Sequence, residues 1–335
     1  MPVHLDIPAA WRGDELFTRD DALLQLGVDD VADLNAALER SSAVPLEEIA
    51  PSEFPLPGLG PKLQALSDAL ERRTGVVRVL GLPVDEYDEP QLARLFWGLC
   101  RHLGTPVSQS AAGERLFHVR DEGFAPSDAR ARGPNSKRTL AFHTDRCDVI
   151  AFLCVRQARS GGENQLISSV TLYNEILARR PDLLAVLMEP YYYQRHNVDS
   201  GNELAWCRQP VFSFQEGHFA GSLLRVLIER AYQSPELPDM TDLQREALDY
   251  LEEVAEEDAL RVTFRQQPGD ILLVNNWVTL HRRLEFEDEP DPALRRHLLR
   301  LWLSVPNSRP LDPLFKDNYG ATAAGALRGG MKPRS

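Results

Sequence analysis

The amino-acid sequence predicts a mixed α and β protein, with an antiparallel sandwich or barrel at its core and helices inserted into it. Short runs rich in β-branched and aromatic residues follow one another after residue 114, with turn residues between them. Before residue 75, Leu and Ala recur at three- and four-residue spacings, which is the period of a helix. Together the two patterns indicate a helical first part followed by a strand-rich core.

The first 75 residues are predicted to form a helical extension packed on that core. Helical spacing is present in LNAALERSS and PKLQALSDALERR, and a Pro-rich connector separates these two segments. The run Val76–Pro83 predicts a strand bounded by Gly and Pro, and Gln91–Leu103 predicts an amphipathic helix that ends at Gly104.

The core itself is predicted over residues 76–305, with a helical insert at about 170–258. Helices of the insert are expected at residues 172–188, 223–232 and 242–257. The last of them begins Thr241-Asp242-Leu243-Gln244, a capping-box pattern that satisfies free amide donors at a helix start. Residues 306–335, rich in Gly, Ala and Arg, form a C-terminal arm that is either packed or partly flexible.

Composition and charge restrict the function. The chain has 335 residues and carries 37 Lys and Arg against 50 Asp and Glu, a formal net charge of −13. This balance disfavours a nucleic-acid partner and favours a small-molecule substrate. The sequence shows neither a signal peptide nor an apolar run long enough to span a membrane, and its four cysteines form no CxxC pair. We therefore expect a cytoplasmic protein with no membrane association and no disulfide framework.

The segment Phe142-His143-Thr144-Asp145 is the strongest candidate for chemistry. It ends the strand-like run RTLAF, and in an extended backbone His143 and Asp145 point to the same side, so both can reach one metal ion. His281, which follows a buried strand predicted at 268–276, can supply a third ligand. HTD alone is a weak signal, but two imidazoles and one carboxylate form the set that suits non-haem Fe(II) oxygen chemistry.

An arginine pair follows the distal histidine. On a strand, Arg296 and Arg300 are four residues apart and face the same side. A guanidinium is the natural bidentate partner of a carboxylate, so this pair can hold an acid that chelates the metal. For Arg296 the alternative is a surface ion pair with the acidic loop 285–291, and for Arg300 it is a structural ion pair.

In these motifs the sequence resembles the taurine dioxygenase and clavaminate synthase-like family of Fe(II)/2-oxoglutarate oxygenases. The resemblance rests on HTD, the distal histidine and the R-x-x-x-R that follows it. It extends to the segments VVRVLGLPVDEYDEPQLARLFWGLCRHLGTPVSQS, RQARSGGENQLISSV and NNWVTLHRRLEF. It covers roughly residues 76–305.

The resemblance implies a double-stranded β-helix, or jelly-roll, core with helices packed around it. By motif, His143, Asp145 and His281 would bind iron, and Arg296 would pair with the far carboxylate of 2-oxoglutarate. Arg300 falls where some members of the family place a second arginine near the prime substrate. Asn164 stands where many members have a Thr that helps to hold 2-oxoglutarate, and an Asn amide can donate a similar hydrogen bond.

Two further residues are candidates for the substrate pocket. They are Gln109 and His118, for which an ordinary loop or sheet position is the alternative interpretation.

The implied reaction uses O₂ and decarboxylates 2-oxoglutarate to succinate and CO₂ while a C–H bond of the substrate is hydroxylated, or the substrate is desaturated or cyclised. We expect a small substrate, anionic or related to an amino acid, or an intermediate of secondary metabolism. One alternative is a non-oxidative metal-dependent jelly-roll enzyme, an isomerase or hydrolase that uses its metal as a Lewis acid. A second is a binding or scaffold protein that keeps the fold without the chemistry.

Overall fold

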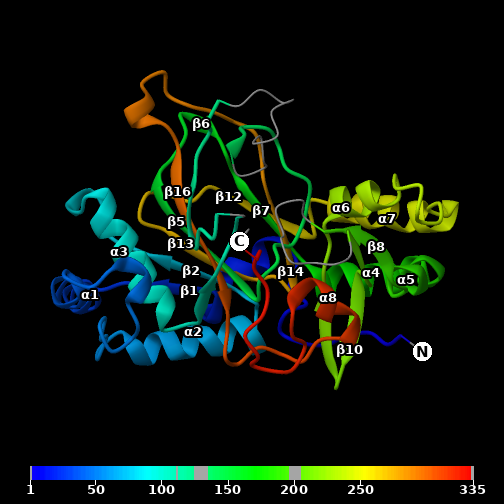
Figure 1. Ribbon diagram of the computed structural model, residues 1–335, viewed down its shortest axis with the longest axis horizontal. Coiled ribbons are helices and arrows are strands. Elements are labelled where there is room, and N and C mark those ends of the chain that lie inside the picture. The colour runs from blue at the N-terminus through cyan, green and yellow to red at the C-terminus, as the bar shows by residue number, and fades with distance from the viewer. Residues whose placement is uncertain (1, 111, 124–134, 196–204, 333–335) are drawn as a thin grey trace.

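Figure 1 shows the computed structural model of the chain, in which residues 2–110, 112–123, 135–195 and 205–332 are described. A sheet of seven strands and a sheet of three strands form the centre, with one group of helices on each side. This arrangement agrees with the mixed α and β class that the sequence predicts.

The seven-stranded sheet is antiparallel except at one edge, where β1 and β2 run parallel. Its strands lie in the order β1 (Leu23–Gln25), β2 (Val76–Leu80), β13 (Ile271–Asn275), β5 (Val149–Arg156), β16 (His297–Ser304) and β3 (Thr105–Val107), and β4 (Leu116–Val119) also pairs with β16.

The three-stranded sheet has the order β12 (Arg261–Phe264), β7 (Asn164–Ser168), β14 (Thr279–Arg283) and is antiparallel. Three short strand pairs complete the described β structure: β6 (Ser160–Gly161) with β15 (Phe286–Glu287), β8 (Tyr191–Gln194) with β9 (Trp206–Gln209), and β10 (Phe212–Gln215) with β11 (His218–Gly221).

The helices fall into two groups. One group comprises α1 (Val28–Ser41), α2 (Gly60–Arg72) and α3 (Glu89–Arg101); the other comprises α4 (Ser169–Arg179), α5 (Pro181–Leu187), α6 (Arg225–Ala231) and α7 (Asp242–Ala255), and α8 (Lys316–Tyr319) follows in the C-terminal arm. The capping box predicted for α7 is confirmed, because the Thr241 hydroxyl accepts from the Gln244 amide at 3.1 Å and the Gln244 side chain accepts from the Thr241 amide. Within the described residues, no helix has the length and apolar character that crossing a membrane requires.

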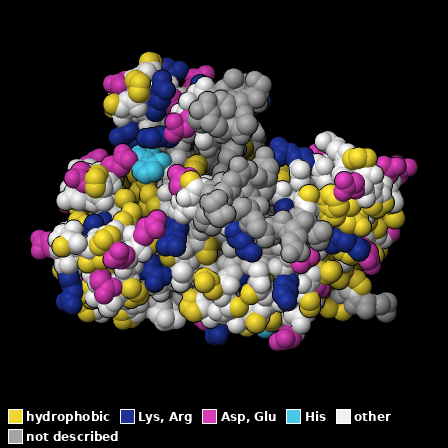
Figure 2. Space-filling view, viewed as in Figure 1, with side chains coloured by type: hydrophobic (Ala, Val, Ile, Leu, Met, Phe, Trp, Pro, Cys, Tyr) yellow, Lys and Arg dark blue, Asp and Glu magenta, His cyan; other side chains and the backbone are white. Residues whose placement is uncertain are grey.

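In the part of the chain that the structure describes, short 3-10 segments lie at Gly13–Thr18, Asp20–Ala22, Leu46–Glu48, Val84–Glu86, Pro292–Leu294 and, in the arm, Pro313–Phe315. Over the face seen in Figure 2, basic and acidic side chains are intermixed.

Alternate side chains of β16 point to opposite faces of the seven-stranded sheet, which shows what packs on each face. Leu299 and Leu301 pack into a core with Phe96 of α3, so this face of the sheet is the outer, helix-covered one. Trp302 faces the other way and shares a core with Leu166 of β7. The inner faces of the two sheets are therefore opposed, and inward-pointing residues from both sheets can share one interior space.

Two predictions about local structure need correction. The run RTLAF before His143 is not a regular strand, because it pairs with β14 only at Leu140 and through an isolated bridge between His143 and His281. The first 75 residues are not wholly helical either, because β1 adds a parallel strand to the edge of β2. An exposed sheet edge offers unpaired backbone groups, and β1 satisfies them there.

The described part of the C-terminal arm is packed. Arg328 makes an ion pair with Asp148 at 2.7 Å, and the two side chains are 0% and 1% exposed. The Gly330 amide also donates to the Arg146 carbonyl at 2.7 Å, and the Met331 amide donates to the Ser108 carbonyl at 2.8 Å. The division of the chain at residues 75 and 305 stays a prediction.

We expect Arg328→Ala to lower the free energy of unfolding by about 3–5 kcal/mol, because it leaves the Asp148 carboxylate buried without its counter-charge. Denaturant unfolding of the full chain measures this. Arg159→Ala is the matched control, since Arg159 pairs with Glu287 at 2.8 Å but the two side chains are 52% and 70% exposed; its midpoint should hardly move. Equal shifts for the two variants would contradict the prediction.

Candidate metal centre

His143, Asp145 and His281 come together between the two sheets. One ligand atom from each lies within 4.8 Å of the other two. The backbone explains the convergence: the His143 amide donates to the His281 carbonyl at 3.1 Å and the His281 amide donates back at 3.0 Å. His281 lies on β14, opposite Leu166 of β7, and so faces the interior.

Each imidazole can present one ring nitrogen to a metal ion. His143 Nδ1 donates to the Ala141 carbonyl at 2.9 Å, so Nε2 is the nitrogen left for a ligand. His281 Nε2 lies 3.8 Å from Asp145 Oδ2. Burial, together with the neighbouring His143, lowers the pKa of His281 to about 3, so this imidazole is neutral at physiological pH.

Neighbouring side chains keep Asp145 ionised and hold it in place. Burial opposes its ionisation, but the Arg300 guanidinium and the two imidazoles outweigh burial and hold the pKa of the carboxyl below its ordinary value. Arg300 Nη1 lies 3.6 Å from Asp145 Oδ2, and the Trp302 indole N–H donates to the same oxygen at 3.2 Å. The Asp145 amide donates to the Asn276 side-chain oxygen at 2.9 Å, which fixes the backbone at this residue.

This donor set fits a divalent transition metal. Two neutral imidazoles and one ionised carboxylate form the facial set that leaves coordination positions open in non-haem iron sites. The bonds from Trp302 and Asn276 to Asp145 are the outer contacts that hold such ligands in place. The ligand types, their protonation states and their convergence all agree.

Arg296 is a buried cation with capacity to bind an anion. Arg296 is 3% exposed, and its Nε has no hydrogen-bond partner. Among the described residues, no carboxylate forms an ion pair with its guanidinium. Burial lowers the pKa of Arg296 to about 10, which leaves it charged at neutral pH. Gly162, at φ +76°, opens the space beside it, because a Cβ there would lie 3.4 Å from Arg296 Nε.

Asn164 lies on β7 with its amide in a polar cluster. It pairs with Arg283 of β14, two residues along from His281 on the same face. Its Nδ2 donates to Gln266 Oε1 at 3.1 Å, so one of its two N–H bonds is already used. A contact from Asn164 to 2-oxoglutarate stays a prediction.

Gln109 and Arg300 form one buried unit. The Arg300 Nε–H donates to Gln109 Oε1 at 2.6 Å, and Gln109 Nε2 donates to the Arg300 carbonyl at 2.9 Å. Gln109 is 0% exposed and Arg300 is 5% exposed. Gln109 therefore acts on the site by positioning Arg300, which in turn lies beside Asp145.

His118 does not join this group. On β4 its neighbour Phe117 faces inward, with the Arg300 guanidinium 5.2 Å from its ring centre. His118 points to the opposite face of the sheet, where its Nδ1 lies 2.8 Å from His297 Nε2. The prediction that His118 lines the substrate pocket is therefore wrong, because the alternation along β4 points its side chain to the face opposite that of Phe117.

Sequence analysis missed Trp302 and Asn276 as parts of the site. Trp302 is two residues beyond Arg300 on β16 and so shares its inward face. That spacing was available as a signal in the sequence. Asn276 offered no comparable signal, because its contact with Asp145 joins residues that are 131 positions apart.

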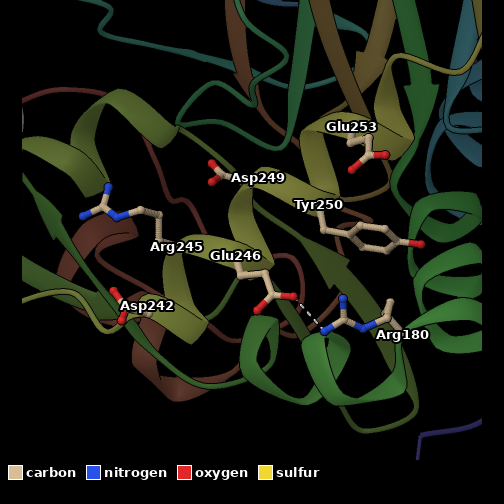
Figure 3. Close-up of a pocket in the computed structure, with 7 residues that line it drawn as sticks. All are labelled: Arg180, Asp242, Arg245, Glu246, Asp249, Tyr250 and Glu253. Carbon is tan, nitrogen blue, oxygen red and sulfur yellow. Dashed lines mark hydrogen bonds and ion pairs between the residues drawn. The ribbon is translucent and has the colours of Figure 1, made fainter.

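A hollow of about 480 Å³ lies elsewhere on the surface, along α7. It is lined by Arg180 together with Tyr250 and charged residues of α7 (Figure 3). Arg180 and Glu246 close one side with an ion pair of 2.9 Å. None of its lining residues belongs to the metal group, so we assign it no part in the chemistry.

The similarity of this chain to known proteins agrees with the family that its sequence resembles. The family described as "Taurine catabolism dioxygenase TauD, TfdA family" matches residues 42–302. FR-33289 synthase from Streptomyces rubellomurinus is 32% identical over 285 residues, which cover 81% of this chain and 81% of that protein. Taurine hydroxylase-like protein SAT17 from Stachybotrys chartarum is 30% identical over 331 residues, which cover 92% of this chain and 84% of that protein.

Among solved structures, an asparagine oxygenase in complex with Fe(II), 2S,3S-3-hydroxyasparagine and succinate aligns with a TM-score of 0.64 at 18% identity. The alignment covers 84% of this chain and 93% of that chain. This likeness confirms the predicted jelly-roll fold class.

We expect Trp302→Phe to weaken binding of a divalent metal at this centre by about 10- to 100-fold, because Asp145 loses the indole donor that orients it. Anaerobic titration of the metal-free full chain with Fe(II) measures this. Trp97→Phe is the matched control, since its indole donates to the Ile49 carbonyl at 3.2 Å within the helical core. An unchanged affinity for Trp302→Phe would show that the indole does not hold the ligand.

Proposed function

Because this chain belongs to the TauD/TfdA family of dioxygenases, we propose that it is an Fe(II)/2-oxoglutarate-dependent oxygenase acting on a C–H bond of a small substrate. The family named from the sequence is thereby confirmed. The observation that carries the proposal is the convergence of His143, Asp145 and His281, with ligand atoms within 4.8 Å of one another, together with the buried Arg296, whose Nε has no hydrogen-bond partner.

The residues divide the work as follows. His143, Asp145 and His281 would hold iron, and the chemistry that bound iron supplies is oxidation: one O₂ converts 2-oxoglutarate to succinate and CO₂ and leaves one oxygen atom for the substrate. Arg300 and Trp302 keep Asp145 ionised and in place. With only three protein ligands, a bound iron ion would keep coordination positions for the oxo acid and O₂.

Arg296 anchors the cosubstrate. 2-Oxoglutarate carries a second carboxylate that does not need to touch the metal, and a buried guanidinium without an ion-pair partner is its natural receptor. Gly162 leaves room beside Arg296 Nε for that carboxylate. Asn164 is proposed to add one amide donor from β7.

The substrate is proposed to be a small amino acid or a related carboxylate. Arg300 places a second positive charge next to the metal group, where it favours an anionic substituent. The asparagine oxygenase structure holds a hydroxylated amino acid together with succinate, and FR-33289 synthase is named as a synthase, which agrees with a role in secondary metabolism. Hydroxylation is the default outcome; desaturation or cyclisation would use the same residues.

The alternative, a non-oxidative metal-dependent isomerase or hydrolase, gains nothing from Arg296. It needs no O₂ and no dicarboxylate cosubstrate, so it would not explain why the Arg296 guanidinium is buried without an ion-pair partner. The family match also favours the oxygenase.

Succinate formation tests the reaction. With Fe(II), O₂ and 2-oxoglutarate, and a panel of free amino acids as substrates, the purified chain should release succinate. Asp145→Ala should release none above background, because a charged ligand is removed from the metal group. Activity that persists in Asp145→Ala, or in the wild type without O₂, would refute the assignment.

We expect Arg296→Leu to raise the KM for 2-oxoglutarate by about 10- to 100-fold, the loss of one charge-assisted hydrogen-bonding partner. The matched control is Arg295→Leu, since Arg295 is the neighbouring residue and is only partly buried. KM for 2-oxoglutarate is measured from initial rates for both variants. The non-oxidative alternative predicts no difference between them.

A further inference from the structure

A second group of imidazole and carboxylate side chains lies on the outer face of the seven-stranded sheet. It comprises Glu89 at the start of α3, His118 on β4 and His297 at the start of β16. One ligand atom from each residue lies within 4.8 Å of the other two. Figure 2 shows histidine side chains reaching the surface beside acidic ones on this side of the molecule.

The geometry is close to what a shared metal ion needs. His118 Nδ1 lies 2.8 Å from His297 Nε2, which is a hydrogen-bond distance, and 3.5 Å from Glu89 Oε1. Ligand atoms that bind one tetrahedral zinc ion at about 2.0–2.1 Å stand roughly 3.3 Å apart. A metal ion would replace the proton that the two imidazole nitrogens share, and the nitrogens would then move apart by about half an ångström to reach that spacing.

Burial prepares the two histidines unequally. The His297 side chain is 5% exposed and fixed by its strand, the His118 side chain is 35% exposed, and the Glu89 side chain is 53% exposed. Burial also lowers the pKa of both imidazoles, that of His297 to about 4, so both rings are neutral at physiological pH. A buried imidazole, a partly exposed imidazole and an exposed carboxylate leave one side of the site open to solvent.

Charges around the group do not cancel its preference for a cation. Arg120 acts on both histidines and Arg156 acts on His297, each as a positive neighbour. Against them stand Glu89 itself and, near His118, Glu114 and Glu122. These carboxylates therefore balance the guanidinium groups.

We propose that Glu89, His118 and His297 form a second metal site, for a zinc-like divalent ion, separate from the iron centre. Two imidazoles and one carboxylate with an open fourth position is a common zinc ligand set. Zinc binds such nitrogen and oxygen ligands more tightly than Fe(II) does. Occupancy ties the first turn of α3 to β4 and to β16, the strand that also carries Arg300 on its other face.

The test isolates this site from the first one. In the full chain with His143→Ala and His281→Ala, equilibrium dialysis against Zn²⁺ should still find one bound ion. Adding His118→Ala should weaken that binding by at least about tenfold, because one of three protein ligands is lost. His218→Ala in the same background is the matched control, since His218 lies on β11, outside both groups, with Nδ1 3.2 Å from the Glu216 carbonyl.

Glu89→Gln serves as a second variant that leaves both histidines and the fold untouched, because its side chain projects from the helix surface; it should also weaken Zn²⁺ binding. Circular dichroism of each variant confirms folding. The proposal is overturned if the background chain binds no Zn²⁺, or if His118→Ala and Glu89→Gln bind it as tightly as His218→Ala does. Neither result bears on succinate formation, so the iron centre is judged separately.

Discussion

The metal centre depends on one piece of backbone pairing, the two hydrogen bonds that His143 and His281 exchange. The run before His143 is not a regular strand, and this isolated bridge, with the hydrogen bond from the Leu140 amide to the Arg283 carbonyl, ties the HTD segment to β14. Once it forms, both imidazoles are held at one point of the interior, with ring centres 4.5 Å apart. Asp145, two residues on, then reaches the same point. A site built in this way is sensitive to the position of one loop, which explains why additional groups hold that loop.

Two carboxylates three residues apart illustrate the difference between a ligand and a structural anion. Asp148 is fully satisfied by protein donors: the Arg328 guanidinium at 2.7 Å, the Trp277 indole at 2.9 Å and the Val305 amide at 3.0 Å. Among the described residues, the Asp145 carboxylate has the Trp302 indole at 3.2 Å, the Arg300 guanidinium at 3.6 Å and His281 Nε2 at 3.8 Å. The first carboxylate has no capacity left for a metal, whereas the second retains it.

β16 contributes side chains to both faces of the seven-stranded sheet. Its inward residues Arg300 and Trp302 hold Asp145, while its outward leucines pack on α3. His297 is the polar exception on the outward face, where it meets His118 and Glu89. Because alternate residues of a strand face opposite ways, one eight-residue strand can support two sites that do not share a side chain.

From the sequence alone, the candidate residues of the site and much of the fold could be predicted. Helical spacing predicted α1, α2 and α3, and the Thr241 box predicted the start of α7, whereas a shared face for Arg296 and Arg300 stays a prediction. These features depend on residues close together in the chain, whose geometry a local backbone dictates.

Only the tertiary structure decided which face of β4 looks inward, which removed His118 from the substrate pocket and joined it to His297. It also decided that Asn276 holds Asp145 and that Arg328 of the arm neutralises Asp148, contacts that span 131 and 180 residues. No local pattern encodes such pairs. They exist because the packing of two sheets brings distant segments together and requires every buried polar group to find a partner there.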